Sequence, residues 1–127
     1  MQRVAIYARE DPTVGASHQL DAQVARVSAV VRRRGGRVVA TYVDCCSGIT
    51  SARPGLGALM AHAGAGWFDV VVVERREQVA PDPSLRRQVR DVLSRAGVRA
   101  VVLHPPPGAR LGRLVAGLAL VDLVEGL

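Results

Sequence analysis

The sequence contains no lysine and very few aromatic residues, and both shortages narrow what the protein can be. All 17 basic residues are arginines, and against 11 acidic residues they give a formal net charge of +6 and a sequence pI of about 10.9. Such a pI is compatible with nucleic-acid binding, but a merely basic surface would give the same value. With 3% aromatic residues, the core must be built from Val, Leu and Ala.

Cysteine is also scarce, since the two that occur, Cys45 and Cys46, are adjacent. A disulfide requires Cα atoms about 5.5 Å apart, so neighbouring cysteines rarely bridge. No His or second Cys pair lies close enough in sequence to complete a zinc site. We therefore expect two free thiols and no metal or other cofactor. A redox role, on the loop beside Asp44, is the alternative.

Long apolar runs and targeting segments are missing as well. The longest apolar run, near the C-terminus, is interrupted by Arg113 and Asp122 and is too short to span a membrane. The N-terminus resembles a strand rather than a signal peptide. We therefore expect a cytoplasmic protein without a membrane partner. No glycine-rich phosphate fingerprint follows the first strand, so a nucleotide-binding Rossmann domain has no motif support.

Strand patterns alternate with helix patterns along the chain. This alternation predicts a single three-layer α/β domain with a mainly parallel sheet of four to five strands. Phe68–Val73 is the most apolar strand, which places it centrally in the sheet. Asp82 is typical of a helix N-cap, and Gly35 and Gly97 are typical helix ends. We expect strands at 3–8, 38–43, 68–73 and 98–103, and helices at 20–34, 54–63, 83–96 and 110–127.

The last predicted helix is apolar on more than one face. Its apolar positions include Leu123, Val124 and the residues expected at a dimer interface, which are Leu111, Leu114, Val115, Leu118 and Val121. A helix of this kind cannot remain in water, so it packs on its own domain or on a second copy of the chain. We expect an α/β core over residues 1–108 and a dimerisation helix over residues 109–127.

The most informative stretch runs from Tyr42 to Leu56. Asp44 and Arg53 flank one small polar loop at the end of a predicted strand, and Pro54 suits the first turn of a helix. In open α/β sheets, ligands bind in the crevice outside the carboxyl ends of the strands. The loop is therefore a candidate binding site, and the alternative is a solvated loop with a surface ion pair.

Taken with the segments 3–9 and 68–73, this stretch closely resembles the catalytic domain of the serine recombinases, the resolvases and invertases. The resemblance covers nearly the whole chain, and the motifs follow the family's order and spacing. It implies DNA as a partner and a homodimer built by the last helix. In this family a serine hydroxyl attacks a DNA phosphate and forms a phosphoserine link, which a deoxyribose hydroxyl later reverses. No metal is needed, because arginines stabilise the charge of the transition state.

Four residues match functional positions of the family. Arg9 falls on the arginine after the first strand, Asp44 on the acidic residue and Arg53 on the arginine of the Arg-Pro-Gly segment. Gln23 matches a glutamine on the first helix. The resemblance therefore implies catalytic roles for Arg9, Asp44 and Arg53, and phosphate binding by Arg9, Gln23 and Arg53. We add Arg75, which follows the central strand, as a further phosphate-binding candidate.

The nucleophile and two arginines of the family are missing. Asp11 stands where the nucleophilic serine belongs, while Glu77 and Gln78 replace an Asp-Arg pair and Pro81 replaces a further arginine. An attacking carboxylate at Asp11 would be repelled by the anionic diester, and its mixed anhydride would hydrolyse. We therefore predict a degenerate domain that no longer exchanges DNA strands, with Asp11 and Glu77 still lining the old catalytic site.

Three readings of function follow. The favoured one is a dimeric binding module that associates with DNA or with an active recombinase. The second is an active recombinase or phosphoryl-transfer enzyme with a displaced nucleophile, for which Asp11, Thr13 and Ser17 are the candidates. The third is a remnant on which a partner protein docks. No sequence typical of a C-terminal DNA-binding domain occurs in these 127 residues, and His18, His62 and His104 are expected to be surface or capping residues.

Overall fold

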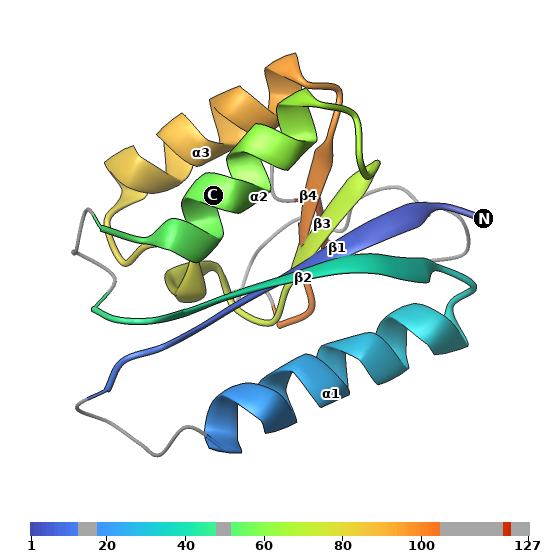
Figure 1. Ribbon diagram of the computed structural model, residues 1–127, viewed down its shortest axis with the longest axis horizontal. Helices are drawn as coiled ribbons and strands as arrows, with labels where there is room; N and C mark the ends of the chain where they lie inside the picture. The colour runs from blue at the N-terminus through green and yellow to red at the C-terminus, as the bar shows by residue number, and fades with distance from the viewer. Residues whose placement is uncertain (13–17, 48–51, 105–120, 123–127) are drawn as a thin grey trace.

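The computed structural model of the protein describes residues 1–12, 18–47, 52–104 and 121–122. In this part of the chain, a five-stranded sheet lies between α1 on one face and α2 with α3 on the other (Figure 1). The elements are β1 Arg3–Glu10, α1 His18–Arg33, β2 Arg37–Cys45, α2 Pro54–Gly64, β3 Val70–Val73, the 3₁₀ turn η1 Arg76–Gln78, α3 Pro83–Arg95, β4 Arg99–Val102 and β5 Val121–Asp122.

The sheet has the order β2-β1-β3-β4-β5. The first four strands pair in parallel, and β5 pairs antiparallel to β4. This confirms the predicted α/β fold with a mainly parallel sheet of four to five strands. The central position predicted for the most apolar strand is also confirmed, because β3 lies third of five and all four of its valines are buried.

Two apolar cores fill the spaces on either side of the sheet. Side chains of successive strand residues point to opposite faces, so β1 contributes to both cores. Tyr7 belongs to the core under α2 and α3, whereas Ile6 packs with Val27 and Val31 of α1. The face of the sheet on which a β1 residue lies therefore follows from its position in the strand.

The N-cap predicted for α3 and the glycines predicted to end α1 and α3 are confirmed. The Asp82 side chain accepts a hydrogen bond from the Ser84 amide at 3.0 Å and caps α3. Gly35 follows α1 and Gly97 follows α3, and both have the positive φ that L residues rarely adopt.

The helix predicted for residues 110–127 lies almost entirely outside the described residues, and so do Leu111, Leu114, Val115 and Leu118. The structure differs from the prediction at Val121 and Asp122, which form strand β5 against Val102 and Val101. Beyond β3, β4 would otherwise present an open edge of unpaired amides and carbonyls, and β5 pairs with that edge. No helix of the described residues is long and apolar enough to cross a membrane.

Candidate functional site

The site predicted from the sequence lies where the strand order reverses. The chain leaves β1 for β2 on one side and later returns to β3 on the other side of β1, so the carboxyl end of β1 lies at a topological switch point. In the pairing of β1 with β2, Arg9 lies opposite Asp44. Arg53 immediately precedes α2. Three of the predicted residues thus come from three segments that meet at one edge of the sheet.

Asp44 anchors the start of α2. Its carboxylate accepts hydrogen bonds from the amides of Gly55 at 2.7 Å and Leu56 at 2.9 Å, and from the Tyr7 hydroxyl at 2.8 Å. Only 4% of the residue is exposed. The first amides of a helix have no partner within the helix, and the positive end of the helix dipole favours an anion there. Asp44 is therefore held by its own protein, with three donors on its two oxygens.

Gly55 is required by this close approach. A Cβ at position 55 would collide with the main-chain oxygen of Val43 and would lie 2.9 Å from each carboxylate oxygen of Asp44. A side chain at this position would push α2 away from the end of β2. The glycine of the Arg53-Pro54-Gly55 segment thus allows the Asp44 carboxylate to reach the helix.

Arg53 is a buried residue whose guanidinium points inward. It donates to the main-chain oxygens of Val79 and of Gln78, the latter at 3.0 Å, and to the Tyr7 hydroxyl at 2.6 Å. The guanidinium carbon also lies 5.6 Å from the centre of the Tyr7 ring, within the range of a cation–π contact. Arg53 therefore joins the start of α2 to β1 and to the segment after η1.

Arg9 makes a second set of bonds to main-chain oxygens. It donates to Cys46 at 3.0 Å, to Glu77 at 2.8 Å and to Gln78 at 2.9 Å. These bonds link the ends of β1 and β2 to η1. We call Tyr7, Arg9, Asp44 and Arg53 the pocket frame, because their side chains join to each other or to the same segments at this edge of the sheet.

The η1 turn contains Glu77 and Gln78, two positions at which the sequence analysis expects a departure from the family pattern. The Gln78 side chain turns back and accepts from the amides of Glu74 at 3.1 Å and Arg75 at 3.0 Å. Glu77 is exposed and pairs with Arg76 at 3.4 Å. Arg75 is exposed beside them. The side chain at position 78 therefore stabilises the turn that follows β3.

The remaining predicted residues are not part of the pocket frame. Asp11 follows β1 and is half-buried, whereas Thr13 and Ser17 lie outside the described residues. Gln23 is half-buried on α1, on the opposite face of the sheet from α2. Cys45 and Cys46 are free thiols, as predicted. Among the described residues, no group of three His, Cys, Asp or Glu side chains could hold a metal.

Three residues of this region were not singled out from the sequence. Tyr7 bridges Asp44 and Arg53. Arg86 is buried and donates to the main-chain oxygens of Ala80 at 2.7 Å and Pro81 at 2.8 Å, and burial lowers its pKa. Its spacing with Val89 and Leu93 places it on the buried face of α3, which was a usable signal.

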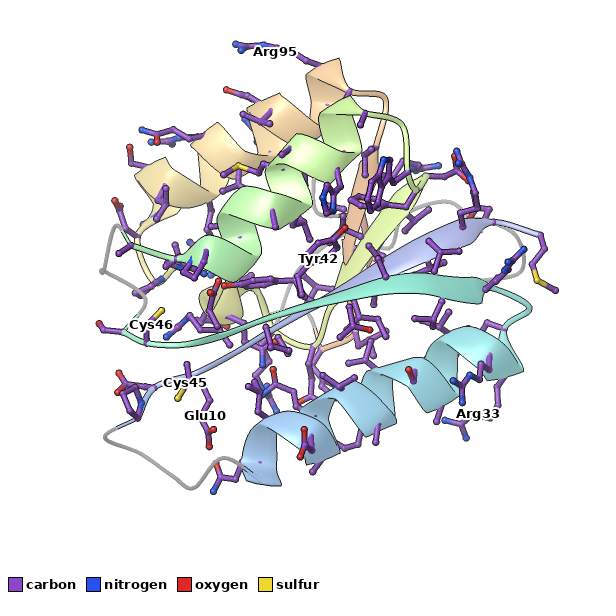
Figure 2. All side chains as sticks on the ribbon, in the orientation of Figure 1. Glu10, Arg33, Tyr42, Cys45, Cys46 and Arg95 are labelled. Atoms are coloured by element: carbon purple, nitrogen blue, oxygen red, sulfur yellow. The ribbon has the colours of Figure 1, made fainter. Side chains whose placement is uncertain are left out.

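Glu10 is the third residue that the sequence analysis did not select. It is only 6% exposed, and neither of its carboxylate oxygens has a hydrogen-bond partner among the described residues. Figure 2 shows it on the side of the sheet that carries α1. A buried carboxylate without a partner opposes folding. Glu10 directly precedes Asp11, one of the candidate nucleophiles.

His62 is not a simple surface residue. Its Nδ1 lies 2.6 Å from the Tyr42 hydroxyl, and its ring stacks on Trp67 with the ring centres 3.8 Å apart. These contacts join α2 to β2 and to the segment before β3, so His62 contributes to packing.

Because of the Tyr7 phenol, we expect the folded protein to lose stability at alkaline pH. Burial raises its pKa above the ordinary value of 10.0, while the hydrogen bond from Arg53 opposes the rise. The unfolded chain would ionise near pH 10 before the folded one does, so this contribution to stability is complete below pH 10 and is lost as the pH rises above it. We expect Tyr7→Phe to lower the free energy of unfolding by about 1–3 kcal/mol at pH 8 and to weaken the loss above pH 10.

Urea titrations from pH 8 to 11 measure both effects. The pKa of Tyr42 is also raised by burial, so part of the alkaline loss will remain in the Tyr7→Phe variant. If the stabilities of the wild type and the variant fall in parallel above pH 10, the Tyr7 phenol is not the group that titrates.

Comparison with known proteins gives one consistent result. The family model described as Resolvase, N terminal domain, matches residues 4–122. The C-terminal catalytic domain of IS1535 TnpA, an IS607-like serine recombinase, is 30% identical, with a TM-score of 0.60 over 78% of this chain and 69% of that one. The N-terminal catalytic domain of TP901-1 integrase is 25% identical, with a TM-score of 0.70 over 80% and 77%.

A third solved structure supports the fold. The catalytic domain of ISC1926 TnpA, also an IS607-like serine recombinase, is 24% identical, with a TM-score of 0.73 over 80% of this chain and 70% of that one. No curated protein matches the sequence significantly.

Proposed function

Because this chain belongs to the family of resolvase N-terminal domains, the catalytic domains of the serine recombinases, we propose that it has lost strand exchange and acts as a DNA-associated binding module. The proposal has two parts, the loss of chemistry and the retention of a binding surface. The observation that carries the first part is the engagement of both retained arginines, Arg9 and Arg53, with the protein's own main chain.

Hydrogen bonds of the pocket frame support the loss of chemistry. A phosphoryl-transfer transition state needs cationic donors that are fixed in place and directed at the phosphate. Arg53 directs its guanidinium at two main-chain oxygens and Tyr7, and Arg9 directs three bonds at main-chain oxygens. These bonds stabilise the shape of the pocket, whereas a phosphate would have to compete with them.

Substitutions at the family's other positions support the same conclusion. Asp11 places a carboxylate where the family has its nucleophilic hydroxyl. Gln78 uses its side-chain oxygen to stabilise the turn after β3, and Pro81 has no donor. The pocket is thus short of an attacking group and of two cations.

Retained binding is supported by the charge that remains on the surface. The chain has a net charge of +6, and Arg75 is exposed on the turn after β3. We propose that a homodimer, built by the segment 109–127, presents such arginines to the DNA backbone. Leu111, Leu114, Val115 and Leu118 remain the proposed contacts of that dimer. An active recombinase that docks on the dimer is the second candidate partner.

Fluorescence anisotropy tests the binding part directly. A labelled random-sequence duplex is titrated with the protein between about 50 and 200 mM salt, because phosphate contacts produce a steep dependence of the binding constant on salt. We expect Arg75→Gln to weaken binding about fivefold and to reduce the salt slope by about one unit. Arg95→Gln, at the exposed end of α3, removes the same charge elsewhere and should leave binding nearly unchanged.

Two results would contradict this proposal. A folded protein that binds no duplex at 50 mM salt would favour a remnant on which another protein docks. Equal weakening by Arg75→Gln and Arg95→Gln would mean that only the total charge matters, with no oriented binding surface.

A further inference from the structure

A groove of about 450 Å³ lies on the face of the sheet that carries α1, opposite the face covered by α2 and the pocket frame. It runs along the second half of α1, from Arg26 to Arg33, continues past the end of the helix to Arg34, and ends against Leu103 and His104, which follow β4. Eight residues of helix span roughly 12 Å. The groove thus has the volume and the length of a site for a small ligand.

The groove has an apolar floor. Ala29 and Val30 of α1 line one side of it, and Leu103 lines the other. Leu103 is half-buried and packs against the core under α1. Such a floor provides a surface for a flat or aliphatic part of a ligand, because it removes apolar area from water.

The rim of the groove carries unbalanced positive charge. Glu74 lines the groove, but it is paired with Arg26 at 2.9 Å, and this hydrogen bond keeps the pKa of Glu74 below its ordinary value. Arg33 and Arg34 have no salt-bridge partner among the described residues. The charges of Arg26 and Glu74 cancel each other. The guanidinium groups of Arg33 and Arg34 therefore remain on the rim for a ligand.

Charge and shape together select the chemical class of the ligand. A guanidinium group binds a phosphate through two parallel hydrogen bonds and does not lose its charge at any physiological pH. The apolar floor, which includes Val30 and Leu103, belongs to the same groove as these arginines. We propose that this groove binds a nucleotide phosphate, with the phosphate on Arg33 and Arg34 and the base or sugar against Val30 and Leu103. This site is separate from the pocket frame and does not depend on the proposed function.

The helix end alone does not account for the groove. Arginines in the last turn of a helix are common, since they complement the negative end of its dipole. The last turn of α3 also contains an arginine, Arg95, which is exposed. Figure 2 shows Arg33 and Arg95 on opposite sides of the molecule. Arg95 thus provides a matched control for Arg33, because it is also an arginine in the last turn of a helix but does not line the groove.

NMR chemical-shift titration of the ¹⁵N-labelled protein tests the proposal. The first probe is deoxyadenosine monophosphate, and deoxyadenosine and inorganic phosphate are titrated separately. We expect the nucleotide to shift the amides of residues 26–34 and 103–104 and to bind about tenfold more tightly than either fragment. A short single-stranded oligonucleotide forms the second arm, and shifts of the same amides by the oligonucleotide alone would assign the ligand to a nucleotide within a strand.

Charge-matched variants decide whether the groove is responsible. The double variant Arg33→Gln with Arg34→Gln should weaken binding of the nucleotide or strand about tenfold or more. The double variant Arg87→Gln with Arg95→Gln, on exposed positions of α3, should change it less than twofold. The proposal is wrong if neither probe shifts the groove amides, if deoxyadenosine binds as tightly as its monophosphate, or if both double variants weaken binding equally.

Discussion

Replacing Asp44 with alanine is expected to remove about 3–5 kcal/mol from the free energy of unfolding. The carboxylate is buried and accepts three hydrogen bonds, from the amides of Gly55 and Leu56 and from the Tyr7 hydroxyl. Without it, two amides at the start of α2 and a buried phenol lose their acceptor. A small domain has a total stability of about 5–15 kcal/mol, so the variant would be close to unfolding.

Urea denaturation of the wild type and of three variants measures this effect. Asp44→Asn keeps the shape and one acceptor oxygen, so it should lose less than Asp44→Ala. Asp91→Ala removes an exposed carboxylate of α3 that forms only a surface pair with Arg90 at 3.5 Å, and it should change stability by less than about 0.5 kcal/mol. If Asp44→Ala is as stable as Asp91→Ala, Asp44 does not anchor α2.

The strands and helices could be predicted from local sequence patterns, because each of these patterns has a single physical cause. The valines of β3 cannot be left in water, and the glycines after α1 and α3 adopt a backbone conformation that few other residues tolerate. The prediction was wrong at Val121, where an apolar helical spacing continued into a residue that pairs with β4. The spacing of apolar residues along one segment carries no information about the open edge of a strand elsewhere in the sheet. The sequence pattern therefore could not reveal that pairing.

The site was predicted as a set of residues but not as a set of contacts. Sequence motifs placed Arg9, Asp44 and Arg53 at one edge of the sheet, and the structure places them there. Motifs could not show which way each side chain points. The bonds of Arg9 to main-chain oxygens depend on the position of η1, which is far away in sequence. Glu10 was missed because burial of a carboxylate at a strand end has no local signal.

The second prediction concerns strand cleavage, for which we expect a large deficit relative to an active serine recombinase. In the serine recombinases that the chain resembles, the attacking serine and several arginines act together, and loss of one preorganised donor typically lowers the rate by about 10² to 10³. In the correspondence with the family that we propose, Gln78 and Pro81 occupy the positions of two such arginines, and their combined loss would correspond to about 10⁴ to 10⁶ even with a nucleophile present. We therefore expect Asp11→Ser to leave the protein without detectable cleavage.

The contacts of the pocket frame are the reason why we expect the single substitution Asp11→Ser to be insufficient for cleavage. A serine at position 11 would restore the hydroxyl, but Gln78 would still direct its side chain to the amides of Glu74 and Arg75. Arg53 would still donate to the main chain and to Tyr7. A hydroxyl without cations around the phosphate is a weak nucleophile in an unsupported transition state.

The central claim is that the domain no longer cleaves DNA. It is tested most directly by incubating the protein with end-labelled DNA, either linear or prepared from a supercoiled plasmid, and running the samples on a denaturing gel. Each sample is quenched in detergent, and a covalent protein–DNA adduct appears as a labelled band that protease removes. An active serine recombinase serves as the positive control, and the wild type, Asp11→Ser and Asp11→Ala are compared. We predict no adduct for any of the three proteins. An adduct formed by the wild type and abolished in Asp11→Ala would show that the domain still cleaves DNA and would contradict the loss of strand exchange.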